Sequence, residues 1–205
     1  MYVNTNKHNV LLRLSGLLLC FFLCLPTQAQ TNKISGIKLK ETIKLGKNLL
    51  LLNGAGQRTK YFIDLYVAAL YLSTKTHDAQ AIIEADEAML IQIHVISNLI
   101  TSENITRGTK EGFTKSTNNN TQNIQEQIDD FLDAFKEKIT IGDIFEIVYL
   151  PGKGVTVIKN RHIVKKLNTD MAFKRALFGI WLSDNPAQKS LKSSMLGETA
   201  SPHTK

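Results

Sequence analysis

The chain has 205 residues, of which 43% are hydrophobic, and its formal net charge is +7. This length and composition are ordinary for one globular domain with a substantial core. The Lys and Arg residues are scattered, apart from two short pairs, and form no stripe interleaved with aromatic residues. That distribution argues against nucleic-acid binding.

The first 29 residues have the composition of an export signal. Lys7 and Arg13 supply positive charge, residues 14–25 are almost wholly apolar, and Pro26 ends the run. This run is shorter than the roughly 20 residues that a membrane span requires. We therefore predict a signal peptide over residues 1–29, cleaved near Ala29, and a periplasmic or secreted protein. An uncleaved N-terminal anchor is the main alternative, and a lipoprotein is a weaker one.

Cysteine and histidine usage bears on metal and redox chemistry. Both cysteines, Cys20 and Cys24, lie in the expected signal, so the cleaved chain would contain none. That excludes disulfides, a thiol nucleophile and a cysteine-bound metal in the mature protein. His77, His94 and His162 have no metal-ligand spacing. We expect neither a metal nor a cofactor.

The first half of the mature chain reads as strands. Apolar and β-branched runs predict strands near residues 34–39, 49–52, 58–63, 65–72 and 89–97. In the last of these, Ile91, Ile93 and Val95 alternate with polar residues, which indicates a half-buried strand. The segment 53–56, Asn-Gly-Ala-Gly, predicts a tight turn because Asn and Gly tolerate positive φ.

Helices, a meander and further helices follow. Thr101 or Ser102 can cap a helix to about Phe113, and residues 124–138 have apolar residues at the helical period. The segments 144–150, 155–158 and 163–167 predict a three-stranded meander. A helix over 170–182, capped by Thr169, and a last helix from Pro186 to Gly197 complete the chain.

This order of elements predicts an α+β fold. Nothing in it has the strict βαβ alternation of a parallel sheet, and the hairpin signals favour an antiparallel sheet with helices on one face. We expect one domain over residues 30–197 and a disordered tail over 198–205.

Three segments in order carry a resemblance to a known family. They are Asn53-Gly54-Ala55-Gly56-Gln57-Arg58, the run 66–72 (YVAALYL), and the run 177–182 (LFGIWL) with Asn185-Pro186. Their order and spacing resemble the chalcone isomerase family, closest to its bacterial chalcone isomerase-like branch, over about residues 34–197. The resemblance implies an open-faced β-sandwich, a large antiparallel sheet with helices packed on it and a ligand cleft between them.

The resemblance also implies candidate ligand-binding residues. Arg58 matches an arginine that the family places in the cleft, where a guanidinium could grip a carboxylate with two hydrogen bonds. Tyr66 stands where the plant enzymes carry a Thr, and a Tyr at this position resembles the fatty-acid-binding branch of the family. Its phenol could donate a hydrogen bond to the same carboxylate. The alternatives are a surface Arg58 paired with Asp64 and a structural Tyr66. A straight strand would separate Arg58 from Tyr66 by about 26 Å, so the chain must bend near residues 63–65.

The resemblance gives less support to catalysis. If the protein were an enzyme, Arg58, Tyr66 and Thr101 would be its candidate catalytic residues. Gly108 and Gly179 stand near two other positions where the plant chalcone isomerases of this family carry polar groups. The loss of such hydrogen-bond donors removes most of the catalytic rate. We expect a non-catalytic protein that binds a fatty acid or similar small apolar carboxylate. The alternatives are an intramolecular lyase or isomerase acting on an enone, and a protein-interaction module without a ligand.

Overall fold

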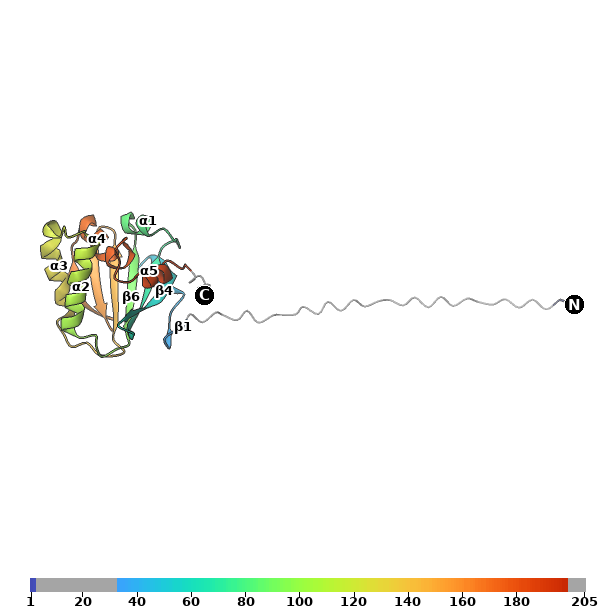
Figure 1. Ribbon diagram of the computed structural model, residues 1–205. Coiled ribbons are helices and arrows are strands. Elements are labelled where there is room, and N and C mark those ends of the chain that lie inside the picture. The colour runs from blue at the N-terminus through green and yellow to red at the C-terminus, as the bar shows by residue number, and fades with distance from the viewer. Residues whose placement is uncertain (3–32, 199–205) are drawn as a thin grey trace. The chain divides into compact units, whose positions relative to one another are not determined.

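The computed structural model describes residues 1–2 and 33–198 (Figure 1). The expected signal over 1–29, apart from its first two residues, and the expected tail, apart from residue 198, lie outside the described residues. Among the residues that are described, no helix is both long and apolar enough to cross a bilayer.

A seven-stranded antiparallel sheet forms the body of the fold, and its strands are ordered as they occur in the chain. The strands are β3 (Thr42–Leu45), β4 (Asn48–Lys60), β5 (Ile63–Leu72), β6 (Met89–Val95), β7 (Ile144–Leu150), β8 (Gly154–Lys159) and β9 (His162–Leu167). Two short strands, β1 (Lys33–Ile34) and β2 (Ile37–Lys38), pair with each other before the sheet begins.

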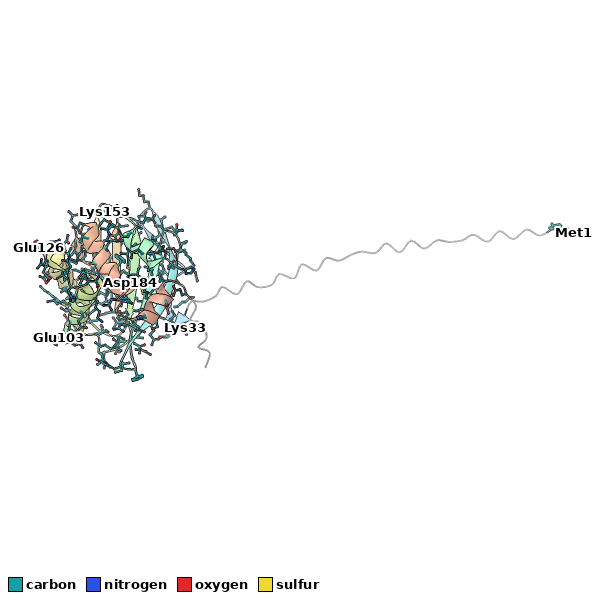
Figure 2. The ribbon with its side chains drawn as sticks, turned by 45° about the horizontal axis from the view of Figure 1, so that its top comes forward. Met1, Lys33, Glu103, Glu126, Lys153 and Asp184 are labelled. Carbon is teal, nitrogen blue, oxygen red and sulfur yellow. The ribbon has the colours of Figure 1, made fainter. Side chains whose placement is uncertain are left out.

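The helices gather on one face of this sheet, as Figure 1 shows. They are α1 (Ala79–Glu84), α2 (Ser102–Ser116), α3 (Gln125–Leu132), α4 (Met171–Leu182) and α5 (Lys189–Met195), with short 3-10 turns at Gln122–Ile124 and Asp133–Phe135. Acidic side chains such as Glu103 and Glu126 project outward from α2 and α3 (Figure 2). The predicted α+β class, with an antiparallel sheet and helices on one face, is confirmed.

Each face of the sheet has its own core. The helical face packs the larger one, in which Phe113, Phe131 and Phe173 make ring contacts. The opposite face packs a smaller core around Leu50 and Tyr71, which residues of β1, β2 and β3 cover. Among the described residues, those buried in the two cores lie between positions 39 and 196.

The prediction of a turn at residues 53–56 is wrong, because this segment is part of the continuous strand β4. A bulge between Leu52 and Gly54 shifts the register, so that Gly54 and Gly56 face the helices. A Cβ on Gly54 would lie 2.2 Å from the carbonyl oxygen of Ser194, and one on Gly56 would lie 2.6 Å from the Cβ of Ser194. Glycine is required at both positions because α5 lies directly against the strand and leaves no room for a side chain. A close approach of another backbone is a common reason for glycine within a strand.

The chain instead reverses at Tyr61 and Phe62, between β4 and β5. Both residues have positive φ, +51° and +65°, the geometry of a type I′ hairpin turn. The hairpin sets Arg58 directly opposite Tyr66. The predicted separation of about 26 Å for a straight strand therefore does not arise, and the reversal comes slightly earlier than the expected bend at 63–65.

Several helix boundaries differ from prediction. Helix α1, capped by Asp78, was not predicted, and the cap of α4 is Asp170 rather than Thr169. Thr101 does cap α2, which runs to residue 116. The last helix begins at Lys189, not Pro186, and ends before a positive-φ Gly197 as predicted.

Lys174 of α4 is fully buried. Its Nζ donates to the carbonyl oxygens of Ile82 (2.9 Å), Ile83 (2.7 Å) and Ala85 (2.7 Å) at the end of α1. The last carbonyls of a helix have no partner within the helix and carry partial negative charge, so a buried ammonium satisfies them. Lys174 thereby joins α1 to α4.

Candidate functional site

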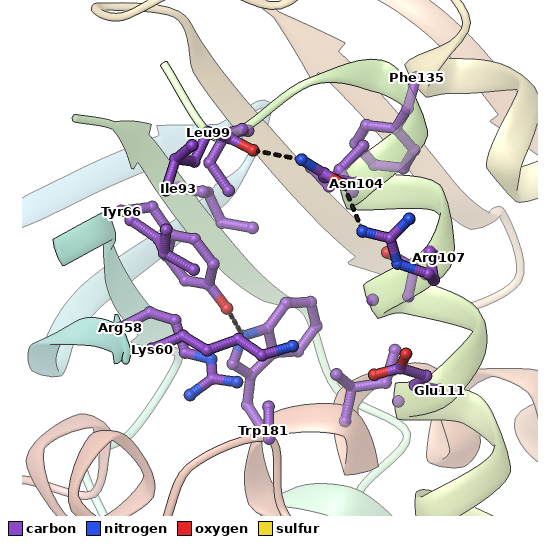
Figure 3. Close-up of a pocket in the computed structure, with 18 of the residues that line it drawn as sticks. Arg58, Lys60, Tyr66, Ile93, Leu99, Asn104, Arg107, Glu111, Phe135 and Trp181 are labelled. Atoms are coloured by element: carbon purple, nitrogen blue, oxygen red, sulfur yellow. Dashed lines mark hydrogen bonds between the residues drawn. The ribbon is translucent and has the colours of Figure 1, made fainter. Parts of the chain in front are cut away.

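A cavity of about 310 Å³ lies between the sheet and helices α2 and α4 (Figure 3). Its walls are mainly apolar and come from β5, β6, β7, the helices and the loops beside them. The apolar lining includes Leu65, Ile93, Ile100, Ile105, Phe131, Phe135, Ile147, Ile180 and Trp181. A cavity of this size and lining suits an apolar small molecule.

Arg58 brings a charge into this cavity from β4. Its Nη1 donates to the side-chain Oε1 of Gln188 (2.9 Å) and to the carbonyl oxygen of Thr59 (3.1 Å). No described carboxylate forms an ion pair with it, and Asp64 instead accepts a hydrogen bond from the Thr59 hydroxyl. The alternative of an Arg58–Asp64 surface pair is therefore not what the structure contains. Because both bonds use Nη1, Nη2 and Nε can face a ligand or Tyr66.

Gln188, just before α5, holds Arg58 in place. Its Oε1 also accepts the backbone N–H of Thr59 (2.9 Å), and its Nε2 donates to Ser190 (2.7 Å). The amide thus couples the end of β4 to the start of α5. The sequence analysis did not identify this residue, because it lies 130 positions from Arg58 and nothing local marks the contact.

Tyr66 lines the cavity beside Arg58, and its hydroxyl oxygen accepts a hydrogen bond from the Nε1 of Trp181 at 3.1 Å (Figure 3). Burial raises the pKa of Tyr66, and the Trp181 bond and the charge of Arg58 oppose this only in part. The phenol therefore stays protonated at neutral pH and keeps its own O–H to donate. That arrangement suits a donor to an anion rather than a general base.

A second arginine, Arg107 of α2, lies on the opposite wall (Figure 3). Unlike Arg58, it is already engaged: Nη1 pairs with Glu103 at 3.5 Å, and Nη2 donates to the amide oxygen of Asn104. The amide nitrogen of Asn104 donates to the carbonyl oxygen of Leu99 (2.9 Å). The sequence analysis missed this polar group, although Glu103 and Asn104 lie four and three residues before Arg107 on the helix, a spacing that was a usable signal.

The three positions matched to catalytic groups of the plant enzymes do not all lie at the cavity. Thr101 does not line the cavity, and its hydroxyl accepts the N–H of Asn104 as the cap of α2 (3.1 Å). Gly108 does line the cavity, with nothing within 4 Å of where its Cβ would be. Gly179 packs against Ser116 of α2 instead. Of these three, only Gly108 reaches the site, and it carries no functional group.

The three histidines between residues 33 and 198 lie away from the cavity. Among the residues described, no group of three His, Cys, Asp or Glu side chains could hold a metal ion. His77 contacts the carbonyl oxygen of Leu196 (2.5 Å), His94 contacts Gln92 (2.8 Å), and His162 lies on β9. None of the three lines the cavity.

Comparison with known proteins agrees with this architecture. A family model described as chalcone isomerase-like matches residues 31–197. The chain belongs to the chalcone isomerase-like family. Among solved structures, it is similar to a fatty-acid binding protein of Arabidopsis thaliana, with a TM-score of 0.66 and 17% identity over 78% of this chain and 92% of the other. A search of curated protein sequences gave no match.

Proposed function

We propose that the protein binds a fatty acid or similar apolar carboxylate in the cavity and does not catalyse isomerisation. The observation that carries the proposal is Arg58, a guanidinium without a carboxylate partner among the described residues, in a cavity with apolar walls. A charge in such a place is costly unless an anion meets it. A fatty acid supplies both the anion and the tail.

Each part of the ligand has a proposed role. The carboxylate accepts from Arg58, with Gln188 orienting the guanidinium, and the phenol of Tyr66 donates to it from the facing strand. The tail lies along the apolar walls and supplies most of the affinity, about 0.8 kcal/mol per buried CH₂. The Arabidopsis neighbour, named as a fatty-acid binding protein, supports the proposal because the two chains have the same fold.

Arg58→Ala is expected to weaken binding of saturated acids by about tenfold to a hundredfold, because charge-assisted hydrogen bonds contribute about 1.5–3 kcal/mol. The matching alcohols carry no charge, so their affinity should change little. Titration calorimetry on acids and alcohols of increasing length measures both. Affinity for acids should rise with length until the cavity is full.

Arg107→Ala is the matched control, since it removes the same group from the same cavity but one already paired with Glu103. It should alter acid binding much less than Arg58→Ala does. Equal losses for acids and alcohols in Arg58→Ala would show that Arg58 is not the anion-binding group. Failure of the wild-type protein to bind any acid would reject the proposed function.

A lack of chalcone cyclisation follows from the same residues. Thr101 caps α2 and does not line the cavity, and Gly108 has no side chain. The raised pKa of Tyr66 keeps its phenol protonated at neutral pH, so it is not available to accept a proton. A hydroxychalcone mixed with the protein should lose its visible absorbance only at the spontaneous rate. Turnover far above that rate, abolished by Arg58→Ala, would support the isomerase alternative.

We further propose that the protein is exported and acts in the periplasm or outside the cell. The basis is the short apolar run 14–25, bounded by basic residues and Pro26. N-terminal sequencing of the protein from its own host should find Gln30 first, in the soluble periplasmic or secreted fraction. Retention of Met1 on membrane-bound protein would contradict cleavage.

A further inference from the structure

Exposed apolar side chains of the described domain concentrate at one end of the sheet. Seven large apolar side chains are exposed between residues 33 and 198, and six of them lie at this end. We call the six the apolar end: Tyr61, Phe62, Ile63, Leu99, Ile141 and Ile163. The seventh, Leu49, lies in β4 beside the β3–β4 turn, at the opposite end of the sheet.

Backbone hydrogen bonds connect the segments of the apolar end. The N–H of Ile96 donates to Leu65 (3.1 Å), and the N–H of Gly142 donates to Val95 (2.9 Å). The N–H of Asn160, in the β8–β9 turn, donates to Ile144 (2.9 Å). The two hairpin turns and the loops around Leu99 and Ile141 therefore lie side by side along the ends of neighbouring strands, which are about 4.8 Å apart.

The tip of the β4–β5 hairpin is made of residues that its geometry disfavours. A turn with positive φ at both central residues favours Asn-Gly, and bulky side chains are rare there. Here the two residues are Tyr61 and Phe62, which are 83% and 102% exposed and pack into neither core. An unfavourable backbone that displays two aromatic rings to solvent points to a use for the rings.

Charges at the apolar end favour an anionic partner. Lys60, Lys138 and Arg161 are exposed and form no ion pair within the described chain, and Lys60 lies over the Tyr61 ring at 5.5 Å. Acidic groups are fewer or already engaged. Asp143 pairs with Lys159 and Glu103 with Arg107, which leaves Asp64, bonded to Thr59, and Glu137.

The cavity reaches the surface at this same end, because exposed residues of the apolar end, Tyr61, Ile63 and Leu99, line it together with Lys60. We propose that the apolar end docks on a phospholipid bilayer, with Tyr61 and Phe62 inserted at the headgroup level. Aromatic side chains favour that level, and flanking Lys and Arg residues favour anionic lipids. A protruding tip with two rings fits a deformable lipid surface better than a flat protein interface.

Docking goes beyond the proposed function, since it does not depend on what the cavity holds. The test uses the chain from Gln30 to Lys205, which contains both described cores and lacks the apolar N-terminal run. Sedimentation with phosphatidylcholine vesicles containing roughly one third phosphatidylglycerol should pull down the wild-type protein. Tyr61→Asn with Phe62→Gly should weaken binding at least tenfold, because two aromatic side chains no longer leave water.

The variant separates docking from misfolding. Asn-Gly suits the turn, so this double variant should be at least as stable as wild type in urea. Leu49→Ser, which removes an exposed apolar side chain at the other end, should bind vesicles like wild type. Docking is overturned if wild type stays in the supernatant, if the double variant still binds, or if Leu49→Ser loses as much. Concentration-dependent dimerisation lost only in the double variant, without vesicle binding, would assign the apolar end to a second copy instead.

Discussion

Gly54→Ala is expected to lower the free energy of unfolding by about 3 kcal/mol, the upper end of the usual cost of overpacking, because the clash is with backbone. The new Cβ would lie 2.2 Å from the carbonyl oxygen of Ser194 and 2.7 Å from the backbone of Met195 and Gly197. These are backbone atoms, so the whole of α5 must move away from β4. Urea denaturation followed by circular dichroism measures the loss.

Gly108→Ala is the matched control. Its added Cβ would meet nothing within 4 Å, and alanine is favoured over glycine inside a helix by about 1 kcal/mol. This variant should be as stable as wild type or slightly more so.

Gly54→Ala should also weaken acid binding, because moving α5 displaces Gln188 from Arg58. An unchanged stability in Gly54→Ala would mean that α5 does not lie against the strand as described.

Lys174→Met is expected to destabilise the protein by about 2–4 kcal/mol at pH 7, because a buried carbonyl left without a donor costs about 1–3 kcal/mol. Methionine fills similar space but cannot donate, so the buried carbonyls of Ile82, Ile83 and Ala85 lose their shared partner. The neighbouring Arg175→Met removes only an exposed pair with Glu84, which contributes at most about 1 kcal/mol. Urea unfolding of both variants should show this difference, and equal losses would contradict the role of Lys174.

Lys174 also makes stability depend on pH. Burial lowers its pKa to about 8, whereas lysine in an unfolded chain titrates near 10.4. Between these values the unfolded chain holds a proton that the native protein has lost, so the free energy of unfolding rises with pH. We expect a rise of about 1–2 kcal/mol from pH 8 to about 9.5 in wild type and none in Lys174→Met.

That measurement stops below pH 10 because tyrosines act in the opposite direction above it. Burial raises the pKa of Tyr71 and of Tyr149 to about 12. Unfolded tyrosine ionises near 10, so stability falls once the pH passes that value. A flat profile for wild type between pH 8 and 9.5 would show that Lys174 keeps its proton in the native state.

The fold class could be predicted because it depends on local patterns. Alternation in β6, the helical period of α3 and the turns between β7, β8 and β9 are each visible within a short window of sequence. The exceptions depend on contacts far along the chain. Asn-Gly-Ala-Gly reads locally as a turn, but these residues remain in a strand because α5, about 140 positions later, needs the space. The bulky pair Tyr61-Phe62 gives no turn signal at all.

The site was predicted in the same uneven way. The family resemblance pointed to Arg58 and Tyr66, and both line the cavity. Their assigned role in binding stays a prediction. What the sequence could not provide is their surroundings: the Gln188 amide that orients Arg58, and the Trp181 indole bonded to Tyr66. Lys174 stood out in the sequence only as half of the short basic pair Lys174-Arg175, since nothing local distinguishes a buried lysine from an exposed one.

The strand order has a consequence for how the protein assembles. Each strand of the main sheet pairs with its neighbour in the chain, and tight turns join β3 to β4, β4 to β5, β7 to β8 and β8 to β9. These four hairpins close short loops and should form early and fast. The contact of α5 with β4 closes a loop of about 130 residues, a greater entropic cost for a single interface. We therefore expect α5 to dock late and to detach first. Because Gln188 leaves with it, the proposed carboxylate site would be assembled last, and it could loosen while the sheet stays folded.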